Sequence, residues 1–387
     1  MRTIGVVTTS RADYGIYLPL LKRIKSDPDL RLHLIVSGMH LSPEFGLTVK
    51  QIEADGFEIA ERVEMLLSSD TPEGIAKSVG VGVMGFAQVY ARSRPDILIV
   101  LGDRFEMYAA VVAAVPFNIP IAHLHGGELT QGAIDDVLRH SITKMSHLHF
   151  VATQEYARRV RQMGEEDWRV IVSGALSLDS LNTTPFMSRA ELETRFNLRL
   201  GDAPLLVTFH PTTLEYEQAE WQMNELLSAL ELCGLPAVFT LPNADTNGRV
   251  LIRMINDCVK SNPMFQKVES FGATGYFSIM RIARAMVGNS SSGIIESASF
   301  RLPVVNIGNR QEGRARGINV IDVGYDRANI LEGIHRATSN EFSASLRDMH
   351  NLYVTSIEAA KTIVDAIKRV ALDESLLVKK FCDRVDE

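Results

Sequence analysis

Short apolar runs rich in β-branched residues alternate along the chain with longer stretches of helical period. In the first half the runs read TIGVVTTS, RLHLIVSG, DILIVLGD, PIAHLHGG, HLHFVAT and RVIVSG, and each is bounded by Gly, Asp or Pro. This alternation is typical of parallel βαβ units with helices on both faces of the sheet. The pattern therefore predicts a doubly wound α/β domain.

The pattern lapses between about Ser177 and Leu200, where the sequence is polar and contains Pro185, and then a second series begins. Its runs read LLVTFHP, AVFTLPN, ARAMVGNS, LPVVNIG and NVIDVG. A chain of 387 residues is long enough for two hydrophobic cores. We therefore predict one domain at 1–180, a second of the same architecture at 181–365, and a C-terminal helix at 366–387 that packs back on the first domain.

Composition excludes several classes of protein. The formal net charge of −7 argues against a nucleic-acid partner, which needs a basic face. The three cysteines have no C-x-x-C spacing, so neither a disulfide framework nor a thiolate zinc site is indicated. The opening MRTIGVVTTS is too short an apolar run for a signal peptide or a membrane span. We expect a soluble cytoplasmic protein with no membrane partner.

Ligands of open α/β sheets bind at the carboxyl ends of the strands, where this sequence gathers polar residues. The first strand exits into TTSRADYG, which lacks the glycine patterns of dinucleotide cofactor sites and P-loops. Arg11 stands there instead, either to pair with a phosphate or carboxylate or to cap a surface loop. His40 follows the next strand, and its role is structural or functional.

Acidic residues and histidines gather at the next two strand ends. Asp103 in LGDRFE is either a helix N-cap or a group that acts on a ligand. HLHGGE and IDDVLRH then add His125, Glu128, Asp135 and Asp136. Individually each can be a cap or a helix-face residue. Crowded together, acids and imidazoles shift one another's pKa and form acid/base pairs, so we favour a catalytic interpretation.

The second half contains the elements of an anion site. VGNSSSGIIE predicts a strand, a turn and a helix whose free N–H groups, with Ser290 and Ser291, suit a diphosphate. Glu296 can accept hydrogen bonds from the two hydroxyls of a ribose. The alternatives are a serine-capped helix and a solvated glutamate. Strand ends also carry His210, Asn243 and Arg310, which completes a predicted nucleotide-diphosphate site.

Taken together, these motifs resemble the hydrolysing UDP-N-acetylglucosamine 2-epimerases of sialic-acid and related nonulosonic-acid biosynthesis. The resemblance covers nearly the whole chain, in order through SRADYG, SGMHL, GDRFE, HLHGGE, IDDVLRHSITKMSH, HPTT, LPNAD, GNSSSGIIE and NIGNRQ. It implies a GT-B-like fold of two Rossmann-like domains with the site in the cleft between them. It also implies a nucleotide-sugar substrate, no cofactor or metal, and a homo-dimer or homo-tetramer.

The family implies conversion of UDP-N-acetylglucosamine and water to N-acetylmannosamine and UDP, by elimination to a 2-acetamidoglycal and rehydration. Two acid/base groups on different faces of the sugar are then needed. By motif, the implied catalytic set is Asp103, His125, Glu128, Asp135 and His210. The implied nucleotide contacts are Arg11, Arg104, Ser290, Ser291, Glu296 and Arg310, and the implied sugar contacts are His40, Asn243 and Asp136.

One position departs from the family pattern. Members that make N-acetylmannosamine often read His-Ile-Glu-Gly-Gly-Glu, whereas His125 stands here at the third place. The alternative substrate is therefore a UDP- or GDP-linked 2,4-diacetamido-2,4,6-trideoxyhexose, as in the legionaminic-acid branch. Further alternatives are a non-hydrolysing epimerase, a GT-B glycosyltransferase and a non-catalytic nucleotide-sugar sensor. The acid-rich cluster argues against a sensor, which needs no acid/base groups.

Overall fold

The computed structural model of the chain describes all residues except 70, 132–133, 183–184, 202, 242–247 and 384–387. It forms two compact units. The first comprises Met1–Glu128, Asp135–Asn182 and Tyr353–Glu387, and the second comprises Leu129–Ile134 and Thr183–Leu352. The chain thus returns to the first unit at Tyr353, upstream of the helix expected at 366–387. Between Glu128 and Asp135 it also makes a short excursion into the second unit.

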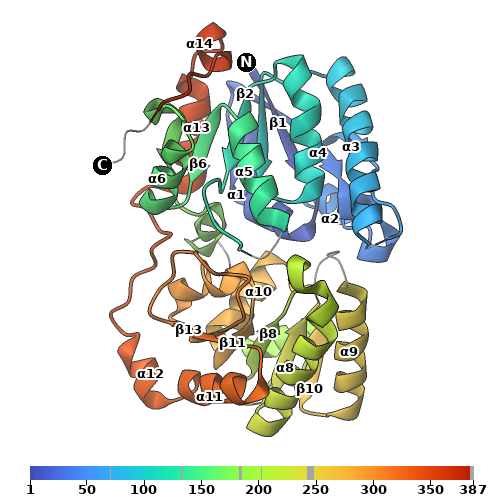
Figure 1. Cartoon of the computed structure of the whole chain (residues 1–387), viewed down its shortest axis with the longest axis vertical. Helices are drawn as coiled ribbons and strands as arrows, with labels where there is room; N and C mark the ends of the chain where they lie inside the picture. The colour runs from blue at the N-terminus through green and yellow to red at the C-terminus, as the bar shows by residue number, and fades with distance from the viewer. Residues whose placement is uncertain (70, 132–133, 183–184, 202, 242–247, 384–387) are drawn as a thin grey trace. The chain divides into compact units, whose positions relative to one another are not determined.

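A parallel sheet forms the centre of the first unit, and its described strands run in the order β3-β2-β1-β4-β5-β6-β7 (Figure 1). The strands are β1 (Arg2–Thr8), β2 (Leu30–Ser37), β3 (Ile59–Val63), β4 (Ile97–Leu101), β5 (Ile121–Leu124), β6 (Leu148–Val151) and β7 (Val170–Val172). The strand order reverses beside β1, which pairs with both β2 and β4. Such a switch point is where doubly wound sheets bind their ligands, at the carboxyl ends of the strands.

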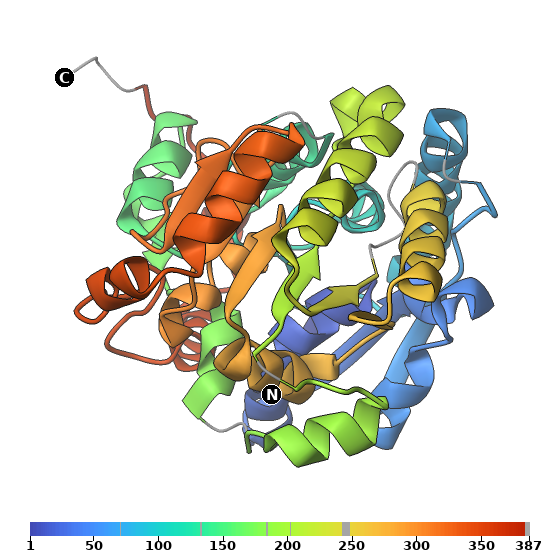
Figure 2. The same ribbon diagram turned by 90° about the horizontal axis from the view of Figure 1, so that it is seen from below.

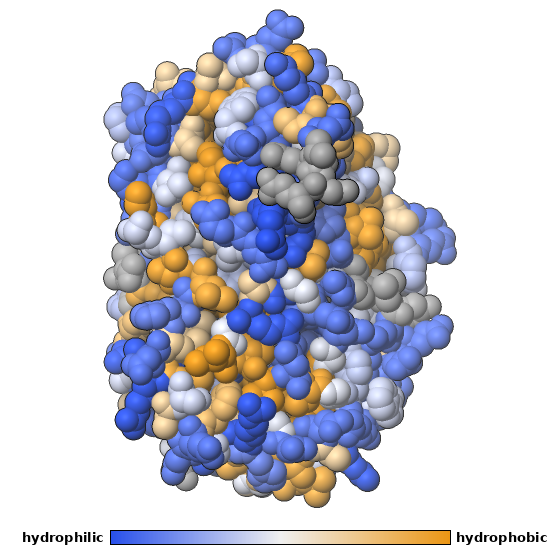
Figure 3. Space-filling view, turned by 60° about the vertical axis from the view of Figure 1, so that its left-hand side comes forward, coloured by the Kyte–Doolittle hydropathy of each residue, from blue (hydrophilic) through white to orange (hydrophobic). Residues whose placement is uncertain are grey.

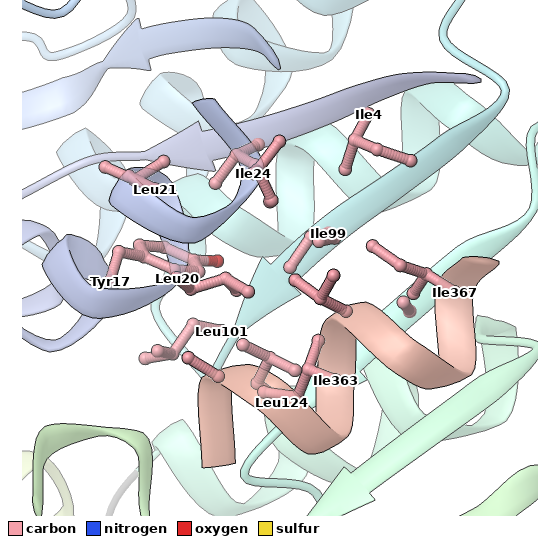
Figure 4. Packing of buried hydrophobic residues seen from close by; sticks show 14 of the residues in the cluster. Ile4, Tyr17, Leu20, Leu21, Ile24, Ile99, Leu101, Leu124, Ile363 and Ile367 are labelled. Atoms are coloured by element: carbon pink, nitrogen blue, oxygen red, sulfur yellow. The ribbon is translucent and has the colours of Figure 1, made fainter. Parts of the chain in front are cut away.

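Helices cover both faces of this sheet, as the sequence predicts. They are α1 (Arg11–Ser26), α2 (Val49–Ala54), α3 (Pro72–Arg92), α4 (Phe105–Ala114), α5 (Ile134–Met145), α6 (Gln154–Gln162), α13 (Ala359–Arg369) and α14 (Glu374–Leu377). One face packs against α1 and α13, and Figure 4 shows Ile4, Ile99 and Leu124 of the sheet facing side chains from both helices. The other face packs against α3 and α4. The strands are apolar on both sides because both sides are covered.

The second unit repeats this plan with the order β10-β9-β8-β11-β12-β13 among its described strands. They are β8 (Leu205–Thr208), β9 (Ala237–Thr240), β10 (Phe265–Val268), β11 (Ala285–Gly288), β12 (Val304–Ile307) and β13 (Val320–Val323). Its helices are α7 (Arg189–Phe196), α8 (Ala219–Cys233), α9 (Gly248–Ser261), α10 (Gly272–Ile282), α11 (Arg327–Ala337) and α12 (Asn340–Ser345). In Figure 2, α8 and α11 lie side by side on one face of the sheet and α10 lies on the other. The predicted GT-B-like class with two Rossmann-like domains is confirmed.

Two strands escaped the sequence analysis, and both lie at the edge of a sheet. These are β3, which reads IAERV, and β10, which reads FQKV. An edge strand is partly solvated and carries polar residues, as both of these do, so it lacks the continuous apolar run that marked the others.

The C-terminal segment is held on the first unit by the buried Arg169 and the partly buried Lys379. Arg169 donates to the backbone carbonyls of Ser375, Leu376 and Val378 at 2.8 to 3.0 Å. Lys379 reaches the carbonyls of Lys144 and Ser146 and pairs with the fully buried Glu165 at 2.9 Å. These contacts give hydrogen-bond donors to backbone carbonyls that the helices and strands leave without partners.

No described helix is both long and apolar enough to cross a membrane. On the face of the molecule in Figure 3, hydrophobic residues form separate patches among hydrophilic ones. Isolated exposed apolar residues are normal on a protein surface and need no special explanation.

Ile363 of α13 is fully buried against the sheet, so we expect Ile363→Ala to destabilise the first unit by about 2–5 kcal/mol. The chain has two tryptophans, Trp168 in the first unit and Trp221 in the second. A urea titration followed by fluorescence in a Trp221→Phe background therefore reports the first unit. Val354→Ala, at a residue 58% exposed, is the control and should change stability by no more than about 0.5 kcal/mol. Equal effects of the two variants would show that α13 does not stabilise the sheet.

Glu165 should make the stability of the first unit depend on acid. Burial raises its pKa, but hydrogen bonds from His149, Lys144 and Lys379 outweigh burial and lower the pKa from 4.5 to about 2. Its stabilisation is therefore present above pH 4.5 and is lost as pH falls towards 2. We expect Glu165→Gln to flatten this part of the curve of unfolding midpoint against pH. Glu73→Gln, at an exposed surface pair, should leave it unchanged, and parallel curves for all three proteins would refute the assignment.

Candidate active site

The first strand end is built around a buried carboxylate. Asp13 accepts hydrogen bonds from the backbone N–H and hydroxyl of Thr9 at 3.0 and 2.7 Å and from the N–H of Ser10 at 3.0 Å. Ser10 and Asp13 together form a capping box that starts α1 directly after β1. Arg11 is consequently the first residue of this helix, and it is partly exposed.

His40 is part of the same framework. The ring is fully buried, with Nε2 3.0 Å from the Thr8 hydroxyl and Nδ1 2.7 Å from the Thr48 hydroxyl. Burial raises the pKa of Asp13, but the hydrogen bond and charge of His40, with the Thr8 and Thr9 hydroxyls, lower it overall. Both nitrogens of His40 already bind protein hydroxyls, so its sugar contact stays a prediction.

Arg104 makes a fork onto the next helix. Its Nε and Nη2 donate to the fully buried Glu106 at 3.1 and 2.9 Å. Burial raises the pKa of Glu106 in spite of this guanidinium. Close by, Gly38 has a φ of +59°, and a Cβ there would lie 3.0 Å from the carbonyl oxygen of Thr9. The same Cβ would lie 3.1 Å from Cγ of Glu106, so the chain after β2 approaches both the end of β1 and the start of α4 at a glycine.

The acidic cluster is organised by a residue that the sequence analysis did not select. Arg139 of α5 is only 2% exposed, donates from Nη2 to the Asp103 carboxylate, and donates from Nη1 to the Glu128 carbonyl at 3.0 Å. Asp136 lies 3.9 Å from the same guanidinium. Asp135 stands beside Asp136 in the first turn of α5, and both are partly exposed. One buried cation thus fixes the ends of β4 and β5.

Two histidines of β5 and its loop have different environments. His123 is buried, with Nε2 2.8 Å from the Gly102 carbonyl and Nδ1 3.1 Å from the Thr143 hydroxyl. Burial lowers its pKa to about 3, so this ring is neutral at neutral pH. His125 is 8% exposed, and its Nδ1 lies 2.6 Å from Oε1 of the buried Glu128.

In the second unit, Asn289 joins two strand ends. Its side chain accepts from the His210 N–H at 2.7 Å and donates to the His210 carbonyl at 2.8 Å. Its own carbonyl accepts from Arg310 at 3.1 Å and from Gln311 at 2.8 Å. The preceding Gly288 has a φ of +138°, and a Cβ there would meet the Thr208 carbonyl oxygen at 1.9 Å. Neither Asn289 nor Gln311 was predicted.

The serine-rich turn is also bound to a tyrosine that was not predicted. The Ser290 and Ser292 hydroxyls lie 2.9 Å apart, and the Tyr276 hydroxyl lies 2.6 Å from that of Ser292. Burial, with a smaller effect of the charge of the nearby Glu296, raises the pKa of Tyr276 to about 12, and hydrogen bonds to the serine hydroxyls oppose this rise. Glu296 is 7% exposed.

The prediction of a continuous helix after the serines is wrong. The structure instead has two short 3₁₀ segments, Ser291–Gly293 and Ser297–Phe300. The hydroxyl of Ser297 donates to the Gly293 carbonyl at 2.6 Å, and serine and glycine both weaken a helix interior. Asn243 lies outside the described residues, so its predicted place is not assigned.

Comparisons with known proteins show the family of this chain. Residues 22–368 match the family model described as UDP-N-acetylglucosamine 2-epimerase. A Campylobacter jejuni protein named GDP/UDP-N,N'-diacetylbacillosamine 2-epimerase (hydrolyzing) is 38% identical over 99% of each chain. A Legionella pneumophila protein named UDP-N,N'-diacetylbacillosamine 2-epimerase (hydrolyzing) is 36% identical over 87% of this chain and 89% of its own.

A solved structure is similar in fold. The UDP-GlcNAc 2-epimerase from Neisseria meningitidis, bound to UDP-GlcNAc, superposes with a TM-score of 0.80 over 96% of this chain and 100% of that one. The sequences of these two chains are 18% identical, so the likeness concerns the fold alone.

Asn289→Ala should destabilise the second unit, because it leaves the buried N–H and carbonyl of His210 without their partners. Each lost group costs about 1–3 kcal/mol. A urea titration in a Trp168→Phe background, where Trp221 is the remaining tryptophan, reports this unit. Asn224→Ala, at an exposed position of α8, is the control for loss of an amide. A midpoint for Asn289→Ala equal to that of the control would refute the role given to Asn289.

Proposed function

The chain belongs to the UDP-N-acetylglucosamine 2-epimerase family, and we propose that it is a hydrolysing member acting on nucleotide-linked N,N'-diacetylbacillosamine, a 2,4-diacetamido-2,4,6-trideoxyhexose. The observation that carries this substrate is the 38% identity, over 99% of both chains, to a relative named for that reaction. The Legionella relative carries the same sugar in its name.

UDP-N-acetylglucosamine is the second candidate substrate, and the description of the matched family favours it. Both sugars carry an acetamido group at C2 and a nucleoside diphosphate at C1, and they differ at C4 and C6. The same C1 and C2 chemistry therefore serves either substrate. His125 replaces the glutamate that is frequent at this place in enzymes making N-acetylmannosamine, which supports the diacetamido sugar.

The reaction begins at C1 because the C2 proton is not adjacent to a carbonyl. As the nucleoside diphosphate leaves, positive charge develops at C1 and makes the C2 proton acidic. Loss of that proton gives a 2-acetamidoglycal. Water then adds at C1 and a proton returns to C2 on the opposite face, which inverts C2 and leaves the free sugar. Acid/base groups are needed on both faces.

The first unit supplies the acid/base groups in this proposal. Asp103 and Asp135 are the leading carboxylates. The guanidinium of Arg139 holds Asp103 in one orientation and favours its ionised form, since an adjacent cation stabilises a carboxylate. Arg11 and Arg104 stand at strand ends of this unit and are proposed to bind the diphosphate.

The second unit supplies binding of the leaving group. Arg310, Ser290 and Ser291 are proposed to stabilise the charge that develops on the diphosphate, and Glu296 to bind the ribose. His210 is proposed to assist the leaving oxygen. Its backbone is fixed by the side-chain amide of Asn289, and the main-chain carbonyl of Asn289 accepts from Arg310, so one residue positions both groups. Asn243, His40 and Asp136 remain proposed sugar contacts.

We also propose that the protein works in the cytoplasm as a homo-oligomer. The three cysteines are free and are placed for no disulfide among the described residues, which supports a reducing compartment. Light scattering of the purified protein measures the oligomeric state.

Proton NMR in D2O with UDP-linked N,N'-diacetylbacillosamine and, separately, UDP-N-acetylglucosamine tests the function. We expect free UDP and a sugar deuterated at C2, with kcat/KM at least about tenfold higher for the diacetamido substrate, because a buried polar contact to its C4 amide is worth about 1.4 kcal/mol. Asp103→Asn should lower kcat by about 10²- to 10⁴-fold. Asp257→Asn, 67% exposed on α9, should have normal activity.

Each failure of this assay has a distinct meaning. Product that keeps its UDP would identify a non-hydrolysing epimerase. Release of UDP without deuterium at C2 would identify simple hydrolysis. Binding of both nucleotide sugars without turnover would identify a sensor.

A further inference from the structure

The backbone at His125 is in an unusual conformation. Its φ is +63°, in the left-handed region, which is strained for a residue with a Cβ. The loop is held there by the His125 N–H, which donates to the Phe150 carbonyl at 2.9 Å, and by Arg159, which donates to the Gly127 carbonyl. Strain of this kind persists where the surroundings impose it, and it clusters at functional sites.

The side chain of His125 is held by a buried carboxylate. Its Nδ1 lies 2.6 Å from Oε1 of Glu128, which is 2% exposed. An ionised carboxylate can only accept a hydrogen bond, so Nδ1 carries the ring proton. Nε2 is then the nitrogen with the lone pair, and a neutral ring in this tautomer can accept a proton but not donate one through Nε2.

That lone pair has no partner among the residues that the structure describes. Nε2 of His125 is buried and makes no hydrogen bond to any described residue. Leaving a buried polar atom unsatisfied costs free energy, so such atoms in a native structure call for an explanation. His33 and His149 of the same unit also have one buried ring nitrogen without a described partner, whereas His40 and His123 have both ring nitrogens bonded to protein groups.

His149 and Glu165 form a similar pair that serves for comparison. His149 Nε2 lies 2.9 Å from Glu165, but His149 is fully buried within β6, and Glu165 is also bound by Lys144 and Lys379. The side chain of His125 is 11% exposed, and His125 follows β5, whose neighbour β4 ends at Leu101, just before Asp103. Of the two pairs, the first therefore stands at a strand end and has a partly exposed histidine.

We propose that His125 is the base that removes the C2 proton, and that Glu128 is the positioning residue that sets its tautomer and stabilises the imidazolium. This rests on the proposed function. The Nε2 lone pair forms a bond to the C2 proton, the C2–H electron pair becomes the C1=C2 double bond, and the C1–O pair leaves with the diphosphate. The imidazolium then releases its proton to solvent, while a carboxylic acid returns a proton to C2 from the other face.

The charges around His125 suit this role. Glu128 is the carboxylate on its own loop, and Arg139 of α5 and Arg159 of α6 bind the loop through the carbonyls of Glu128 and Gly127. His123 on β5 and His149 on β6 both have a pKa lowered by burial, so they add no charge at neutral pH. Removing the Glu128 charge should therefore make the imidazolium less stable.

The first experiment is chemical rescue. His125→Gly accommodates the positive φ, leaves room for an imidazole, and should lower kcat by about 10²- to 10⁴-fold. Added imidazole should raise the kcat of His125→Gly at least about tenfold. The Asp103→Asn variant has lost a carboxylate and keeps its imidazole, so added imidazole should not raise its kcat. Loss without rescue in a folded His125→Gly protein would overturn the proposal.

The second experiment separates positioning from structure. Glu128→Gln keeps an oxygen that can accept from Nδ1 but removes the charge, so kcat should fall by about 10- to 100-fold with little change in KM. The acid limb of the kcat profile should also move to lower pH, because a less stable imidazolium loses its proton sooner. His149→Gln should leave that limb in place, and an unmoved limb in Glu128→Gln would contradict the role of Glu128.

A measurement without turnover distinguishes this inference from the proposed function. Nitrogen-15 NMR of histidine-labelled protein, with the His125 signal assigned from His125→Gly, should show the ring protonated at Nδ1 and not at Nε2. If the wild-type protein turns over no nucleotide sugar, the proposed function fails whatever the tautomer. If it does turn over and Nε2 carries the proton, the function stands and the inference about His125 fails.

Discussion

The buried guanidinium of Arg139 is the constraint on which the first unit's site depends. A cation that is 2% exposed must be paired, because an uncompensated charge in the interior is strongly destabilising. Arg139 meets this requirement with the Asp103 carboxylate after β4 and the Glu128 carbonyl after β5. The same contacts bring two strand ends to fixed positions. The contacts that stabilise the buried charge are thus the same contacts that position the acid/base groups.

The second unit reaches a comparable result with a neutral group. Asn289 uses both ends of its amide on the His210 backbone, and its carbonyl accepts from Arg310 and Gln311. A neutral amide suits a place that is proposed to hold a diphosphate, because it adds no charge to compete with the ligand. A carboxylate at the same place could not donate to the His210 carbonyl, and its negative charge would repel the phosphates. The charged Arg139 in the first unit and the neutral Asn289 in the second thus each suit what their unit is proposed to bind.

Much of the fold was accessible from the sequence because its signals are local. Strands buried on both sides appear as continuous apolar runs, and the family resemblance indicated by the strand-end motifs is confirmed. The edge strands β3 and β10 escaped because one side of each is solvated. Arg139, Asn289 and Tyr276 escaped for a different reason. Their partners are distant in the sequence or on another element, and no periodicity records such a contact.

The division between strand and loop explains where the chemistry lies. The inner strands β4 and β5 are saturated, since their backbone groups pair with strands on both sides and their side chains are buried on both faces, so they have no group left for a ligand. The segment HLHGGE leaves this regular pairing at His125, where the backbone enters the left-handed region. Once outside the ladder, the side chain turns towards Glu128 and one ring nitrogen stays without a described partner. The irregularity of this loop is therefore what makes a reactive group available on an otherwise rigid sheet.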